Sequence, residues 1–109
     1  MAKYLIEASY SQAGLRALVK DGGTGRKKVV EAAAKALGGR VESMYFAFGT
    51  SDVYAIVDAP DNVTVAAFAL AIGGTGIAAH LKTVVLLTAE EVDQAAKKSA
   101  AAGYRAPGA

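Results

Sequence analysis

The sequence predicts one α+β domain with the order strand, helix, strand, strand, helix, strand, followed by a C-terminal helix. Three observations support this. Segments in which apolar residues alternate with polar ones are interleaved with segments of helical period, glycine-rich stops separate the segments, and 109 residues suffice for one domain. Two βαβ units joined by a hairpin form the ferredoxin-like fold. We expect residues 1–99 to form this domain and residues 100–109 to be a flexible tail.

The first half begins with a strand. Apolar side chains at positions 4, 6, 8 and 10 alternate with polar ones, which is typical of a half-buried strand. Ser11 is suited to cap a helix that starts near Gln12. We expect residues 21–25 to interrupt this helix, which resumes from Arg26 and ends at two glycines, Gly38 and Gly39.

The second half repeats the pattern. We expect strands at residues 40–48 and 53–57 with a tight turn at residues 49–52 between them. Asp61 or Asn62 is suited to cap the next helix. The last strand is predicted at residues 79–87, and Thr88 followed by Glu91 is the signature of a capping box that starts the final helix.

Composition excludes several function classes. The chain has no cysteine, so disulfides, zinc–thiolate sites and thiol nucleophiles are absent, and 12 basic against 10 acidic residues do not indicate binding to nucleic acid or to an anionic membrane. The start of the chain lacks the apolar region of a signal peptide. The uncharged residues 63–79 fit a buried helix and a loop better than a membrane span. We therefore expect a cytoplasmic protein without nucleic-acid or membrane partners.

The strands predict a homodimer. Val53, Ala55 and Val57 point to one side of their strand and Tyr54 and Ile56 to the other, so both sides are apolar. The apolar runs at residues 45–48 and 84–87 have the same property. A sheet with two apolar faces needs two covers. Helices supply one, and a second copy of the sheet is expected to supply the other. The alternative is that these residues are strand ends covered by the C-terminal helix.

The chain resembles the GYD family, named for a Gly-Tyr-Asp signature. The similarity lies at residues 3–10, 22–26, 46–49, 86–88 and 104–108. Gly49 and Asp52 stand at the signature's Gly and Asp, whereas Ser51 replaces its Tyr. The resemblance implies the dimeric α/β-barrel arrangement, in which two ferredoxin-like sheets meet face to face. It implies no particular activity.

The most suggestive segment for a ligand is an anion-binding candidate at Gly23, Thr24, Gly25 and Arg26. Free N–H groups at a helix start with cations behind them can hold a phosphate or carboxylate. The segment is neither a P-loop nor a dinucleotide fingerprint. The alternative is a flexible helix break with a solvated basic face.

Further candidates are single residues. His80, the one histidine, and Asp52 are candidate acid–base groups, with a surface role for His80 and a turn-capping role for Asp52 as the alternatives. Four aromatic residues are candidates to line a ligand pocket or, alternatively, to be core and interface residues. These are Tyr10, Tyr45, Phe48 and Tyr54.

Three functions remain open at this level. The first is a homodimeric protein that binds a small, partly apolar molecule without a cofactor or a metal. The second is a cofactor-free enzyme of the isomerase or monooxygenase type that uses His80 or Asp52. The third is a module whose role is assembly. Fold alone does not choose among them.

Overall fold

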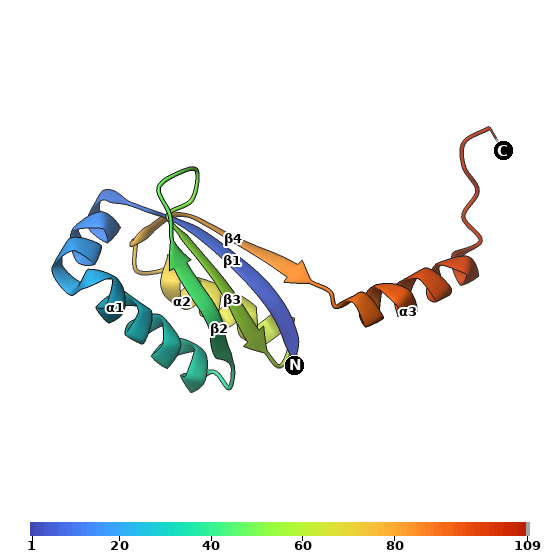
Figure 1. Cartoon of the computed structure of the whole chain (residues 1–109). Helices are drawn as coiled ribbons and strands as arrows, with labels where there is room; N and C mark the ends of the chain where they lie inside the picture. Colours follow the sequence, from blue (N-terminus) through green and yellow to red (C-terminus); the bar gives the residue numbers. More distant parts are fainter. Residues whose placement is uncertain (109) are drawn as a thin grey trace.

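A computed structural model describes residues 1–108 as a four-stranded antiparallel sheet with two helices on one face and a third helix extending away from it (Figure 1). The strand order is β2-β3-β1-β4, which confirms the ferredoxin-like prediction. The elements are β1 (Ala2–Tyr10), α1 (Gln12–Ala36), β2 (Arg40–Phe46), β3 (Val53–Ala59), α2 (Asn62–Gly73), β4 (Ala78–Leu86), α3 (Ala89–Ser99) and a 3-10 turn (Ala100–Ala102).

The core lies between the sheet and helices α1 and α2. The alternating apolar residues of the two central strands, among them Tyr4 and Ile6 of β1 and Val57 of β3, face the helices and are almost completely buried. Val65 and Phe68 of α2 complete this layer. The period of two seen in the sequence therefore places one face of each central strand against the helices.

Helix α1 contains the predicted interruption, but it is confined to one residue. Two helical segments within Gln12–Ala36 meet at a kink at Gly22, instead of a break over residues 21–25. Gly22 has φ 75° and ψ 165°, a conformation that is essentially restricted to glycine. One such residue bends the axis, and the helix continues directly after it, so Gly23, Thr24 and Gly25 are helical.

Two strands end at positions that differ slightly from the predicted ones. β2 ends at Phe46, two residues earlier than expected, because the Ala47 N–H bonds to the Asp52 carbonyl at 2.8 Å and the chain then loops out. β3 extends to Ala59, which pairs with Ala2 of β1.

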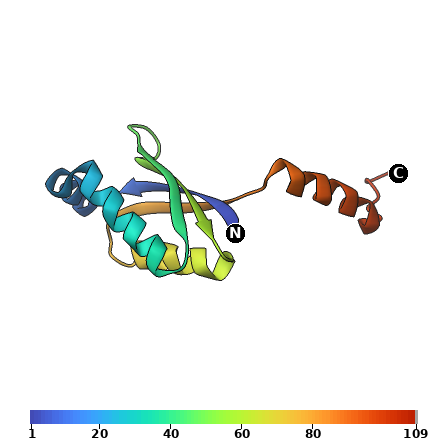
Figure 2. The same cartoon turned by 60° about the horizontal axis from the view of Figure 1, so that its bottom comes forward.

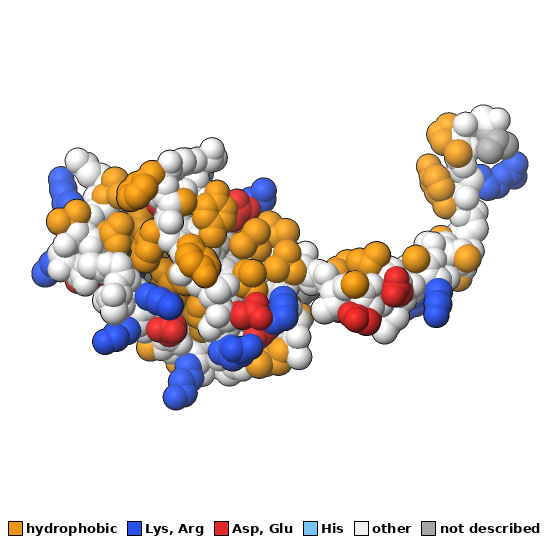
Figure 3. Space-filling view, viewed as in Figure 1, with side chains coloured by type: hydrophobic (Ala, Val, Ile, Leu, Met, Phe, Trp, Pro, Cys, Tyr) orange, Lys and Arg blue, Asp and Glu red, His pale blue; other side chains and the backbone are white. Residues whose placement is uncertain are grey.

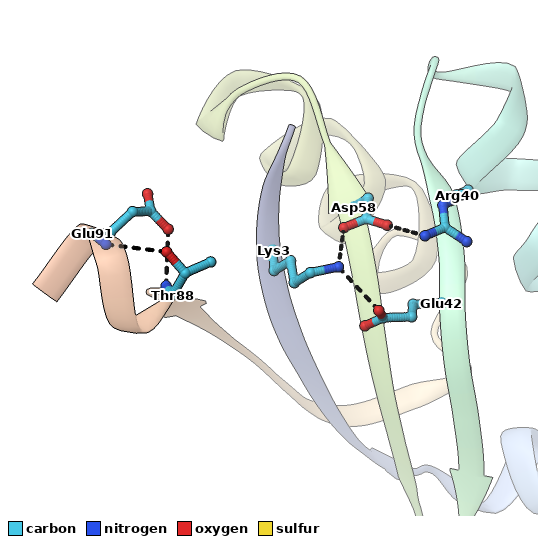
Figure 4. Close-up of polar contacts among 6 residues, drawn as sticks. All are labelled: Lys3, Arg40, Glu42, Asp58, Thr88 and Glu91. Carbon is cyan, nitrogen blue, oxygen red and sulfur yellow. Dashed lines mark hydrogen bonds and ion pairs between the residues drawn. The ribbon is translucent and has the colours of Figure 1, made fainter.

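The helix caps follow the predicted chemistry. Ser11 accepts from the Gly14 N–H at 3.1 Å, and Asp61, not Asn62, accepts from the Thr64 N–H at 2.8 Å. Thr88 and Glu91 form both hydrogen bonds of the capping box, at 3.1 and 2.9 Å (Figure 4).

Within residues 1–108, no segment covers the second face of the sheet. Its apolar residues come from three strands, and Figure 3 shows hydrophobic side chains gathered over the strands with charged groups near the lower edge. The register places Leu5, Tyr54, Ile56, Val84 and Leu86 on this face. We call it the open face.

The charged groups of the open face neutralise one another. Lys3 Nζ lies 2.8 Å from Asp58 and 3.0 Å from Glu42, and Arg40 lies 2.9 Å from the other Asp58 oxygen (Figure 4). The hydrogen bond from Lys3, with the positive charges of Lys3 and Arg40, holds the pKa of Asp58 below its ordinary value. The face is thus mixed in character, with its charges paired.

Helix α3 stands apart from the sheet (Figures 1 and 2). Of its residues, all described by the structure, none is buried. The radius of gyration is 17.2 Å, against about 13 Å for a compact chain of this length. The C-terminal helix therefore does not cover the strand ends of its own chain. Among residues 1–108, no helix is long and apolar enough to cross a membrane.

Candidate functional site

A cavity of about 360 Å³ lies between the sheet and helices α1 and α2. Helix α1 lies along β2 and α2 lies along β4, which leaves space above the two central strands. The walls are apolar apart from one end. A volume of this size is in the range of small-molecule pockets, which is about 300–1,000 Å³.

Small side chains contribute to the space in this cavity. Five lining residues are alanines, and they come from five different elements. They are Ala8, Ala33, Ala55, Ala71 and Ala78. Protein interiors are ordinarily packed to high density, so the space reflects the choice of residues and not the fold alone.

The polar end of the cavity is formed by Arg26 and Tyr10. The Arg26 side chain is 14% exposed, and its Nη1 lies 3.4 Å from Asp21. Burial raises the pKa of the Tyr10 hydroxyl, while the charge and hydrogen bonding of the neighbouring Arg26 guanidinium oppose that rise. Within residues 1–108, the Arg26 Nε is buried and has no hydrogen-bond acceptor.

The bend in α1 brings Arg26 to this position. Arg26 follows Gly22 by about one helical turn and faces the cavity, whereas Lys27 and Lys28 on the same helix are exposed. Gly23 lies over the ring of Phe46, since a Cβ added there would come 3.3 Å from it. The bend therefore separates one cation of the basic segment from the other two.

Tyr10 is held by a β-bulge and by Asp52. The pairing of β1 with β4 shifts between Ser9 and Tyr10, and the Tyr10 N–H donates to the Asp52 carboxylate at 2.8 Å. The Asp52 N–H in turn donates to the Ala8 carbonyl at 2.8 Å. Gly14 makes room for the ring, because an added Cβ would lie 2.8 Å from Tyr10 Cδ1.

The predicted aromatic residues do not form one pocket. Tyr10 lines the cavity, but Tyr45 and Tyr54 are cross-strand partners on the open face, with Tyr45 72% exposed. Phe48 is fully exposed in the loop after β2. These three side chains are thus available to a partner surface and not to the cavity.

The predicted acid–base candidates lie outside the cavity as well. His80 is exposed on β4 and lines a separate hollow of about 240 Å³, which Glu7, Ser9 and Lys82 also line. Asp52 accepts from the Tyr10 N–H at the end of β1, a structural role that differs from the turn-capping role considered for it. Among residues 1–108, no group of three or more His, Cys, Asp or Glu side chains could hold a metal ion.

The four residues of the anion-binding candidate lie in different surroundings. Thr24 is exposed, Gly23 lies against Phe46, and Gly25 lies in the helix near Asp21. Of the four residues, only Arg26 lines the cavity. Arg26 is thus the one residue of this candidate that lies at the cavity, and it sits near the start of the helical segment that follows the kink at Gly22.

Comparison with known proteins identifies the family. The family model of the GYD domain matches residues 4–96. This chain belongs to the GYD domain family. The comparison with curated proteins gave no match.

Solved structures share the fold of this GYD protein, and one of them is informative here. It is a 5-chloro-2-hydroxyhydroquinone dehydrochlorinase from Burkholderia phenoliruptrix AC1100, in complex with 2,5-dihydroxybenzoquinone. The TM-score is 0.55 at 13% identity, and the match covers 81% of this chain and 96% of that one. A likeness at this identity shows the fold alone.

The structure also shows what sequence reasoning missed. Arg26 and Tyr10 were separate candidates, and their meeting at one end of a cavity was not predicted. They lie on different elements and meet through a bulge, a bend and a glycine contact. The signal in the sequence that could have indicated the cavity was the concentration of alanines on the inward faces of the predicted strands and helices.

Proposed function

We propose that this GYD protein binds a small, largely apolar molecule in the cavity between its helices and its sheet. The observation that carries the proposal is the alanine-walled cavity of about 360 Å³ with one polar end. Core residues that left such a space unfilled would forfeit packing energy, and a ligand that filled it would recover that energy. The dehydrochlorinase of the same fold was solved with a small ring compound, which supports the proposal by analogy.

The test is titration with N-phenyl-1-naphthylamine, a neutral apolar dye whose fluorescence rises in apolar surroundings. We expect saturable binding of one dye per chain. Ala55→Leu, which places a larger side chain in the cavity, should abolish it. Ile56→Ser, on the neighbouring residue that faces the opposite side of β3, is the matched control and should leave dye binding intact. If Ile56→Ser abolished dye binding and Ala55→Leu did not, the dye would lie on the open face, and the proposal would be refuted.

We also propose that the protein works as a homodimer through the open face. The face carries apolar residues from three strands, its charges are paired within the chain, and α3 does not cover it. Large apolar patches are seldom left in water by monomers. A second sheet with the same pattern is a suitable cover, as the resemblance to the GYD family implies.

Light scattering at micromolar concentration tests the dimer. We expect a particle of twice the chain mass of 11.1 kDa. Ile56→Lys should reduce it to the monomer, whereas Val63→Lys, at an exposed position of α2, should not. A wild-type particle of 11.1 kDa would refute this part of the proposal.

The two alternatives remain distinguishable. An enzyme that used His80 or Asp52 would have its reacting group outside the cavity. A substrate that it turned over would therefore not displace the dye from the cavity. A module for assembly alone would bind no dye in the cavity, and Ala55→Leu would leave every measured property except stability unchanged.

A further inference from the structure

We propose that the ligand of the cavity is an amphipathic monocarboxylate, whose apolar body fills the alanine-walled space and whose carboxylate meets Arg26 and Tyr10. This inference rests on the proposed function and specifies the chemical class of its ligand.

The first argument is the charge of the cavity wall. Arg26 is the one charged side chain among the described residues that line the cavity, and no acidic residue lines it. A guanidinium cannot lose its proton at ordinary pH, and a charge in apolar surroundings is costly unless it is paired. The wall therefore carries a fixed positive charge at one end.

The second argument is that the charge is poorly paired within the chain. The contact between Arg26 Nη1 and Asp21 is 3.4 Å long, beyond the usual range of about 2.7–3.2 Å for such hydrogen bonds. Asp21 is itself 38% exposed. The Arg26 Nε is out of contact with solvent and without an acceptor among residues 1–108. Buried donors of this kind are rare, so the site lacks an acceptor that a ligand can supply.

The third argument is the arrangement of donors. Guanidinium groups hold carboxylates through two parallel hydrogen bonds. The Tyr10 hydroxyl lies beside Arg26 and stays protonated, since burial raises its pKa, so it can donate a further hydrogen bond. The Thr75 hydroxyl, another polar group on the wall, already donates to the Ile72 carbonyl at 2.6 Å. Arg26 and Tyr10 are therefore the pair available to an anion.

The single cationic side chain on the wall favours a ligand with one anionic group. The rest of the wall is apolar, so a second charge on the ligand would be buried without a partner. Dicarboxylates and phosphorylated sugars are disfavoured for this reason. An aromatic or branched aliphatic acid fits the chemistry of the wall.

The experiment compares 2-naphthoate with 2-naphthamide by calorimetric titration at pH 7. The two probes have nearly the same shape and differ in charge. We expect the wild-type protein to bind the acid roughly 10–100-fold more tightly, as hydrogen bonds to charged groups require. Arg26→Met should remove this preference while binding of the amide persists, and Tyr10→Phe should reduce it.

Lys27→Met is the matched control. It removes the same charge from the next residue, whose side chain is exposed, and should leave the preference for the acid intact. If Lys27→Met and Arg26→Met reduced the preference for the acid equally, the preference would come from the overall positive charge of the basic segment. A contact with Arg26 would then be refuted. If Arg26→Met does not fold, the preference of the wild-type protein and its persistence in Lys27→Met decide the matter.

The outcomes separate this inference from the proposed function. Equal binding of both probes, abolished by Ala55→Leu, would leave the small-molecule pocket in place and refute the carboxylate. Failure of both probes and of the neutral dye to bind would refute the pocket and the carboxylate together.

Discussion

Filling the cavity from its floor should stabilise the protein, which is unusual for a buried substitution. Ala55 lies on the central strand β3, is 4% exposed and faces the cavity of about 360 Å³. Ala55→Leu adds three carbon atoms at about 0.8 kcal/mol each, or about 2.4 kcal/mol. Ordering the new side chain costs about 0.5–1 kcal/mol. We expect the free energy of unfolding to rise by about 1.5 kcal/mol.

Ala59→Leu is the matched control for this prediction. Ala59 is on the same strand and the same face, is 2% exposed, and borders a space of only about 10 Å³. A leucine there has no room, and overpacking of this kind costs about 1–3 kcal/mol. The two variants should therefore change stability in opposite directions.

The assay is urea unfolding of the three proteins at one protein concentration, because association would otherwise shift the midpoints. The measured quantity is the free energy of unfolding from the midpoint and slope. If Ala55→Leu loses as much stability as Ala59→Leu, the space above the central strands is not available, and the reasoning behind the ligand pocket fails with it.

The remaining predictions concern three local features. Because the pKa of Asp58 is lowered by its hydrogen bond from Lys3, its contribution is complete above the unfolded carboxyl pKa of about 4 and is lost as pH falls below that value. Asp58→Asn should thus flatten the loss of urea stability in acid, and an unchanged acid slope would contradict this. Gly22→Ala should lower the free energy of unfolding by about 1–3 kcal/mol, because Gly22 has a positive φ. Gly25→Ala should raise it by up to about 1 kcal/mol, because Gly25 is helical and a Cβ there has ordinary space. Equal effects of the two variants on the urea midpoint would be evidence against a bend held by Gly22. Thr88→Ala should cost α3 about 1 kcal/mol, seen as faster amide exchange in that helix with exchange in β1 unchanged. Faster exchange in β1, or unchanged exchange in α3, would contradict the independence of α3 from the sheet.

Much of the fold was accessible from the sequence because its signals are local. The alternation at residues 4–10 predicts which face of β1 is buried, and a capping box needs only Thr88 and Glu91. Where the chain deviates from a regular element, the prediction was less accurate. A run of glycines over residues 22–25 looks like a break, yet the backbone departs from helix only at Gly22.

The candidate site was less accessible because it depends on distance in space. Arg26 was predicted to bind anions through its place in the chain, whereas the role proposed for it here rests on its burial beside Tyr10. The aromatic candidates were chosen for residue type, and the register sent Tyr54 to the opposite face from Ala55. Alanines attract little notice in a sequence, although here five of them line the cavity.

The isolated position of α3 has a consequence for solution measurements. Its eleven residues are fewer than the roughly 12–15 that a free helix needs to persist in water. Ala89, Val92 and Ala96 form an apolar stripe, and none of the three residues is buried by the described part of the chain. Helix content in this segment should therefore fall on dilution while the strand signal stays constant. The loss of helical ellipticity at low protein concentration would report directly on how often α3 is in contact with another molecule.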